Sequence, residues 1–280
     1  MQRVGVTHCS RPGLVALTFD DAPAGPPAIS SPEELPDAPL LAELTALRVR
    51  ATFFVVGSKV TRPEQLARYL DPGHQIAFHS WTHAPFRRQD QAFYDLEIGR
   101  SEKVLSAAAG TRLAKYLRPP YLVLDADAKA ELRRRNYTAV SASIDMRDWH
   151  PRTTTEHVSH MLTSSATLGD PAERSHIVLM HVDKNNSAVR GAPAMLRTVV
   201  PLLRRNGFRF VRVDECVHGV QTAPRLRRTS SVRVPRRSGA VWPSVRFSPK
   251  LSTVGWSYSW RAPVLCELAP SSASRPRVES

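Results

Sequence analysis

The chain has 280 residues, of which 42 % are hydrophobic, and a formal net charge of +14. This length is enough for one domain of a couple of hundred residues plus additional sequence. No apolar run approaches the ~20 residues that a membrane-spanning helix needs, so we expect no membrane span. The first 18 residues do not resemble a secretory signal, because they lack a continuous apolar stretch before a small-residue cleavage site.

The positive charge is concentrated after residue 220. Residues 221–280 hold 11 Lys and Arg against 2 Asp and Glu, together with 7 Pro and 12 Ser, and show no sustained periodicity. We therefore expect residues 1–220 to form one domain and residues 221–280 to be a disordered basic tail. The alternative is that the tail is a basic module that binds nucleic acid or an anionic polymer.

Strand-like and helical segments alternate between residues 14 and 213. Short apolar runs predict strands over 14–19, 51–56, 75–78, 116–117, 137–144, 176–180 and 208–213. Helical spacing predicts helices over 38–48, 63–70, 91–108, 125–135, 154–164 and 192–205. This alternation is typical of an α/β fold with parallel strands inside and helices outside. About seven such units favour a barrel, although the alternation alone is also compatible with an open sheet.

The three cysteines are Cys9, Cys216 and Cys266. None belongs to a C-x-x-C pair, which argues against a thiolate zinc site. Cys9 and Cys216 flank the segments that are predicted to fold. We expect a disulfide between them if the protein is exported, and two unpaired thiols otherwise.

Polar residues follow two of the predicted strands at their ends, where parallel α/β barrels carry their catalytic residues. Asp20 and Asp21 follow the first strand, and His79 and His83 follow the third. Adjacent carboxylates point in different directions from an extended backbone, so the two Asp residues can have separate tasks. The H-x3-H spacing predicts both imidazoles on one face of a helical turn. With Asp21 they form a candidate zinc site, whereas either motif alone could be an ordinary solvated turn.

Three further motifs lie at later strand ends. In Arg118-Pro119-Pro120-Tyr121 the prolines have no N–H, so the Tyr121 amide is the first free donor and a candidate oxyanion ligand. The alternative is an ordinary turn. The segment 145–149 follows the next strand, and His181 would be the third histidine at the same end of the barrel.

Together, five motifs in order, TFDD, HSWTH, RPPY, DMRDW and LMH, resemble the NodB-homology domain of carbohydrate esterase family 4 over residues 9–218. The resemblance implies a distorted (β/α) barrel and a divalent metal, Zn²⁺ before Co²⁺, held by Asp21, His79 and His83. It implies Asp20 as general base and His181 as general acid.

The same resemblance implies roles for five more residues. Arg118 would orient Asp20, and Asp148 would tune His181 or Arg118. The Tyr121 amide would bind the oxyanion, while Trp149 and Leu179 would form walls of the acetyl pocket. The chain departs from the family at three positions, Ala22, Leu122 and Val182, where the family usually has Gly, Gly and an acidic residue.

The activity that the resemblance implies is metal-dependent hydrolysis of N-acetyl groups from polysaccharides that contain N-acetylglucosamine. Chitin or chito-oligosaccharide is the favoured substrate, because CSRPGLVALTFDD and DEC most resemble fungal-type chitin deacetylases. Peptidoglycan, acetyl-xylan and a non-catalytic carbohydrate-binding role are the alternatives. We expect a monomer that is secreted or works at the cell wall, as the family usually does, and that does not bind nucleic acid.

Overall fold

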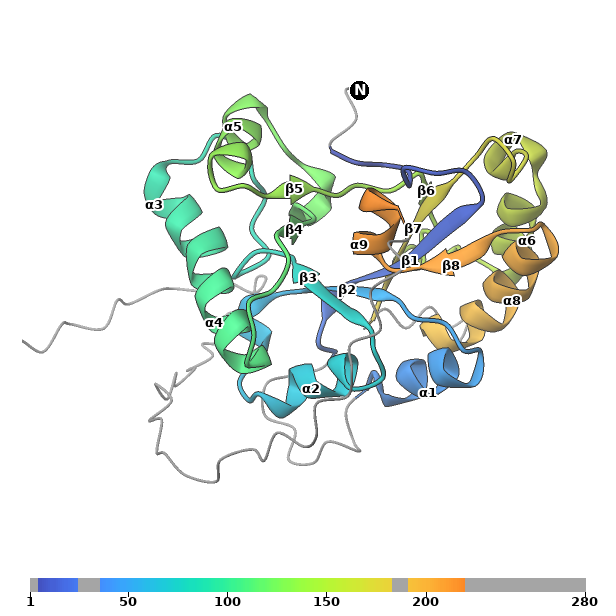
Figure 1. The fold of residues 1–280 in the computed structure, drawn as a ribbon, viewed down its shortest axis with the longest axis horizontal. Coiled ribbons are helices and arrows are strands. Elements are labelled where there is room, and N and C mark those ends of the chain that lie inside the picture. Colours follow the sequence, from blue (N-terminus) through green and yellow to red (C-terminus); the bar gives the residue numbers. More distant parts are fainter. Residues whose placement is uncertain (1–4, 25–35, 183–190, 220–280) are drawn as a thin grey trace, which may run out of the picture. The chain divides into compact units, whose positions relative to one another are not determined.

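The computed structural model describes residues 5–24, 36–182 and 191–219, and helices surround a curved sheet in these residues (Figure 1). The strands described are β1 (Leu14–Ala22), β2 (Thr52–Val55), β3 (Gln75–Phe78), β4 (Tyr116–Leu117), β5 (Thr138–Ala139), β6 (Ile144–Asp145), β7 (His176–His181) and β8 (Arg209–Val211). The helices described are α1 (Ala38–Ala46), α2 (Glu64–Leu70), α3 (Gln91–Tyr94), α4 (Ser101–Ala109), α5 (Ala126–Arg134), α6 (Thr155–Thr163), α7 (Ser165–Leu168), α8 (Gly191–Arg205) and α9 (Val213–His218).

These elements confirm the predicted α/β alternation. The strand expected over 75–78 begins and ends at those residues. The helix expected over 91–108 is present as α3 and α4, joined by a π-helical segment at Asp95–Arg100. The basic tail at 221–280 lies outside the described residues, so its disorder and the domain boundary near residue 220 stay predictions.

All strand pairs among the described residues are parallel. The order along the sheet is β5-β4-β3-β2-β1-β7-β6, and β8 pairs with the first half of β1. The central strand β1 therefore has three partners, and Asp20 near its end is in register with His181 of β7. This pairing brings residues from both ends of the domain to one edge of the sheet.

The two end strands of the sheet are joined by only four residues of chain. If the seven strands lay flat, β5 and β6 would be about 29 Å apart at the usual spacing of about 4.8 Å. The five Cα steps from Ala139 to Ile144 span at most about 18 Å, so the sheet must curve to bring its ends together. The result is the expected distorted barrel.

The single strand predicted over 137–144 is therefore wrong. This run leaves β4 after two paired residues, crosses to the opposite end of the sheet, and pairs with β7 for two more. The crossing is held by a bridge between Val6 and Val140, and by a hydrogen bond from Ser143 N to Ile177 O. An apolar, β-branched run does not reveal that its two halves have different partners.

Side chains of β1 alternate between a cluster that includes the helices (Val15, Leu17, Phe19) and a cluster inside the curve of the sheet (Leu14, Ala16). With the same two-residue period, Thr18 and Asp20 face the inside of the curve. Every residue of β1 is buried, as expected for a parallel strand that is covered on both faces. The strand thus delivers a carboxylate to the interior of the barrel.

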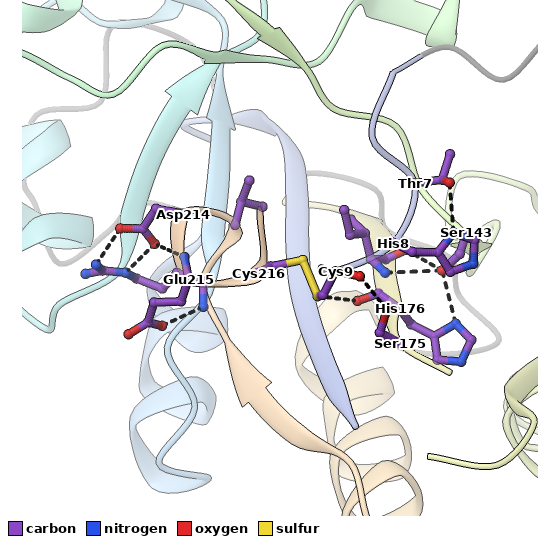
Figure 2. Close-up of a disulfide and its surroundings, with 12 residues drawn as sticks. Thr7, His8, Cys9, Ser143, Ser175, His176, Asp214, Glu215 and Cys216 are labelled. Atoms are coloured by element: carbon purple, nitrogen blue, oxygen red, sulfur yellow. Dashed lines mark hydrogen bonds and ion pairs between the residues drawn. A yellow bond between two sulfur atoms is a disulfide. The ribbon is translucent and has the colours of Figure 1, made fainter. Parts of the chain in front are cut away.

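A disulfide joins Cys9 to Cys216, across 207 residues of sequence (Figure 2). It connects the segment before β1 to α9, a helix that the sequence did not predict. Next to it, Ser10 N donates to Cys216 O at 2.8 Å, and Ser175 Oγ donates to Cys9 O at 2.9 Å. The bridge thus ties the start of the domain to its last described helix.

None of the helices in the described residues combines the length and the apolar character that a membrane span needs.

We expect the double variant Cys9→Ser/Cys216→Ser to lower the free energy of unfolding by about 2–5 kcal/mol, because the unfolded chain loses a long covalent loop. Urea titration followed by circular dichroism measures this change. Wild type measured with a reductant is the control and should approach the variant. Equal unfolding midpoints for the variant and the oxidised wild type would contradict the expectation.

Candidate metal centre and catalytic residues

The end of β1 carries a β-bulge that places two carboxylates at one site. Between Phe19 and Ala22 the pairing with β2 gains one extra residue on β1, a feature that re-aims side chains at strand ends. Asp21 has a positive φ of 67°. As a result the Asp20 and Asp21 side chains both reach the same imidazole: Asp20 Oδ2 and Asp21 Oδ1 each lie 3.7 Å from His79 Nε2.

The two histidines of HSWTH lie on a loop after β3 and not on the helical turn that we expected. Ser80 and His83 have positive φ values of 65° and 67°, which are incompatible with a helix. His83 N donates to Ser80 Oγ at 2.9 Å and closes the turn. Both imidazoles nevertheless lie beside the same carboxylate oxygen, since His83 Nε2 is 3.2 Å and His79 Nε2 is 3.7 Å from Asp21 Oδ1.

Asp21, His79 and His83 form a group whose potential ligand atoms all lie within 4.8 Å of one another. His79 Nδ1 lies 2.7 Å from the Arg118 carbonyl oxygen, which can only accept, so Nδ1 carries the proton and Nε2 presents its lone pair. One carboxylate with two imidazole nitrogens is a donor set that suits zinc-like divalent cations. The residues present therefore fit a metal ion.

The surroundings of Asp21 and His83 favour the protonation states in which these side chains can bind a metal. Burial and the neighbouring His79 imidazole lower the pKa of His83 to about 4, so its ring is neutral at pH 7. Burial raises the pKa of Asp21, but the imidazoles of His79 and His83 and the Lys59 ammonium outweigh this effect and lower the pKa below its usual value. A carboxylate and a neutral imidazole are the states that bind metals.

Arg118 is fully buried and holds Asp20. Its Nη1 donates to Asp20 Oδ1 at 2.7 Å and to Thr18 Oγ1 at 2.8 Å. Its Nη2 donates to Ser141 O at 2.9 Å, and its guanidinium lies 4.2 Å from the Phe54 ring centroid. The expected Arg118–Asp20 pair is present, and it fixes one carboxylate oxygen while the other faces His79.

Asp148 contacts His181 twice. His181 Nδ1 lies 2.7 Å from Asp148 Oδ1, and the His181 backbone N–H donates to Asp148 Oδ2 at 2.7 Å. Burial lowers the pKa of His181, but the hydrogen bond and charge of Asp148, with Asp20 and Asp21, outweigh it and raise the pKa. Of its two expected partners, Asp148 contacts His181, and among the described residues it makes no hydrogen bond or ion pair with Arg118.

The three expected substrate-binding residues differ in how close they lie to the candidate metal ligands. Tyr121 has a positive φ of 57°, its ring centroid lies 4.7 Å from that of His83, and its N–H has no acceptor among the described residues. Leu179 is buried in β7, whereas Trp149 is 47 % exposed and lies near Arg147. No described contact ties Trp149 to the metal-site group, so its role as a pocket wall stays a prediction.

The departures from the family pattern leave these groups in place. Leu122 has a φ of 55°, a left-handed backbone that Gly adopts more easily. Val182 N donates to Asp20 O at 3.1 Å, and Ala22 is buried at the end of β1.

Two residues near the site were missed by the sequence analysis. Lys59 Nζ donates to the Asp21 carbonyl at 2.7 Å, and the buried Glu97 accepts hydrogen bonds from the loop between His79 and His83. Neither belongs to a motif. A Glu within an otherwise helical pattern normally predicts an exposed position, so only the fold could reveal it.

Comparison with known proteins finds related deacetylases. The polysaccharide deacetylase family model matches residues 7–140. A chitin deacetylase from Colletotrichum lindemuthianum is 28 % identical over 221 residues, which cover 76 % of this chain and 82 % of that protein. A chitooligosaccharide deacetylase from Bradyrhizobium sp. is 30 % identical over 208 residues, which cover 69 % of this chain and 86 % of that protein.

Solved structures show the same fold. The chitin deacetylase structure from Colletotrichum lindemuthianum has a TM-score of 0.61 at 27 % identity, covering 76 % of this chain and 91 % of that one. A family 4 acetyl xylan esterase from Clostridium thermocellum, in complex with a cobalt ion, has a TM-score of 0.59 at 27 % identity, covering 72 % and 89 %. The chain therefore belongs to the polysaccharide deacetylase family of hydrolases, the NodB-homology domain of carbohydrate esterase family 4.

Proposed function

We propose that this protein hydrolyses N-acetyl groups of chitin or chito-oligosaccharide and releases acetate. The observation that carries the proposal is the convergence of Asp21, His79 and His83 within 4.8 Å, beside a carboxylate and a third imidazole. Metal ligands next to a candidate base and a candidate acid are the groups that metal-assisted amide hydrolysis uses. A shared fold alone would not indicate activity, since a family 4 pseudoenzyme mutant has the same fold at 18 % identity.

Zn²⁺ is the metal that we propose, with Co²⁺ as the alternative, and Asp21, His79 and His83 would hold it. When bound, such a cation polarises a carbonyl oxygen and lowers the pKa of a bound water. The Arg118 carbonyl supports this assignment, because it orients the His79 ring with Nε2 toward the site.

Asp20 is assigned as the general base. Arg118 and the β1 backbone fix its position, and Oδ2 is left to accept the proton of the attacking water near His79. His181 is assigned as the general acid. Asp148 holds Nδ1, so the proton on Nε2 is the one delivered to the departing amine nitrogen, which cannot leave as an anion.

The Tyr121 N–H is assigned to the developing oxyanion. The prolines before it fix the backbone, and a donor that has no acceptor among the described residues can bind the substrate oxygen. Leu179 and Trp149 would form walls of the acetyl pocket. Acetate and a glucosamine unit are the products.

We prefer chitin over peptidoglycan and acetyl-xylan because a chitin deacetylase and a chitooligosaccharide deacetylase are matched over 82 % and 86 % of their length. A peptidoglycan-N-acetylglucosamine deacetylase of Listeria monocytogenes is 31 % identical, but the match covers only 38 % of it.

The disulfide supports a secreted or cell-wall location, because such bonds persist in oxidising compartments. We propose a monomer without nucleic-acid binding.

The Zn²⁺ affinity of a variant that lacks one proposed ligand tests the metal site. We expect His79→Ala to weaken Zn²⁺ binding by about 100-fold or more, beyond the 10–100-fold typical of outer contacts. His74→Ala is the matched control, since His74 is also buried and precedes β3 where His79 follows it. Isothermal titration calorimetry on chelator-treated protein measures both. Similar affinities for wild type and His79→Ala would contradict the assignment.

Activity of Asp20→Asn tests the deacetylase proposal against a non-catalytic carbohydrate-binding role. We expect acetate release from chito-oligosaccharide to fall by about 10²–10⁴-fold, because the base is lost, while Zn²⁺ still binds. Asp37→Asn, which removes the buried partner of Arg68, controls for loss of a buried charge. A wild type that binds the oligosaccharide and Zn²⁺ but releases no acetate would favour the non-catalytic role.

The contact between Asp148 and His181 predicts a change in pH dependence. Asp148 raises the pKa of His181, so the protonated acid persists to higher pH than for an ordinary histidine. In Asp148→Asn we expect the alkaline limb of the kcat/KM profile to move to lower pH. Asp145→Asn, which alters a nearby carboxylate bonded to Arg147 N, should leave the limb in place. An unchanged limb in Asp148→Asn would rule out this role of His181.

A further inference from the structure

The loop between His79 and His83 is held on one side by the chain after β2. Gly57 N donates to Ser80 O, and Ser58 N donates to Trp81 O, each at 2.9 Å. These bonds satisfy two carbonyl groups of the loop. Gly57 is required here, because a Cβ at this position would lie 2.6 Å from the Trp81 ring.

The other side of the loop is held by a single carboxylate. Glu97 Oε2 accepts from Trp81 N at 2.9 Å and from Thr82 N at 2.8 Å, and Oε1 accepts from Thr82 Oγ1 at 2.6 Å. Glu97 is only 1 % exposed. Three donors thus converge on one buried side chain, and all three come from the two residues next to His83 on its N-terminal side.

Glu97 comes from the π-helical segment Asp95–Arg100 between α3 and α4. The wider turn is a local departure from the α-helix of a kind that often occurs at functional sites. Three residues further on, the Arg100 guanidinium lies 4.3 Å from the Trp81 ring centroid. The π-helical segment therefore contacts the loop through both a carboxylate and a cation.

We propose that Glu97 is a positioning residue that sets the metal affinity of the site by fixing the loop that carries His83. The proposal rests on the proposed metal site. Ser80 and His83 both have left-handed backbone, which residues other than Gly adopt only when surrounding contacts impose it. The Glu97 carboxylate supplies such contacts between these two residues. It is not a catalytic residue, because its hydrogen bonds within the described part of the chain all go to the loop.

Zn²⁺ affinity of Glu97 variants tests this proposal without relying on activity. We expect Glu97→Ala to bind Zn²⁺ about 10–100-fold more weakly than wild type, the range typical of residues that orient ligands. Glu97→Gln should stay within about threefold of wild type, because one amide oxygen can still accept both backbone N–H groups. A competition titration with a chromophoric chelator measures the affinities, and thermal unfolding of the metal-free proteins measures stability.

Glu131→Ala is the matched control. Glu131 is a buried carboxylate on α5 that binds Arg134 and Arg135, so its loss should lower stability and leave Zn²⁺ affinity unchanged. If Glu97→Ala does not fold, Glu97→Asp replaces it, because the shorter side chain keeps the charge but cannot reach the loop. A folded Glu97→Ala or Glu97→Asp that binds Zn²⁺ within threefold of wild type would overturn the proposal.

The same titration separates this proposal from the metal site on which it rests. If wild type and His79→Ala bind Zn²⁺ equally, the metal site is wrong, and the role of Glu97 falls with it. If His79→Ala loses affinity and the folded Glu97 variants do not, the metal site stands and only the role of Glu97 is wrong.

Discussion

The buried ion pair between Arg118 and Asp20 is the interaction on which the rest of the structure depends. A guanidinium without exposure to water is tolerated only when it is paired and hydrogen-bonded. Arg118 meets this requirement with groups from distant parts of the chain: Thr18 and Asp20 on β1, and Ser141 in the crossing between β5 and β6. The contacts that neutralise the charge therefore also tie the end of β4 to β1 and to the chain that crosses between β5 and β6, and they fix the carboxylate that we propose as the base.

Around this pair, the site is built from backbone conformations that are unfavourable in isolation. Asp21, Ser80, His83 and Tyr121 all have positive φ values. Such residues persist where surrounding contacts impose them, and they cluster at functional sites. Here the imposing contacts are a β-bulge, the Lys59 ammonium on the Asp21 carbonyl, and the Glu97 carboxylate. The geometry of the candidate ligands is thus a property of the folded domain and not of the short motifs that contain them.

This explains how much of the fold and site could be predicted from sequence. Local signals were sufficient for the strand at 75–78, for the main helices, and for the placement of Asp20, His79 and His181 at strand ends. Non-local pairing was not accessible: the run 137–144 splits because its halves join opposite ends of the sheet. The H-x3-H spacing indicated the correct convergence for an incorrect reason, since spacing alone cannot show that Glu97 and residues 57–58 hold the loop out of a helix.

The three partners of β1 have a consequence for how the chain reaches its native state. β1 is synthesised before β7 and β8, its partners from residues 176–211. Until those residues leave the ribosome, β1, the longest strand described, has a bare edge, which is a template for intermolecular pairing. Such long-range contacts slow folding. A truncation that ends before β7 should therefore yield aggregates and not a smaller stable barrel.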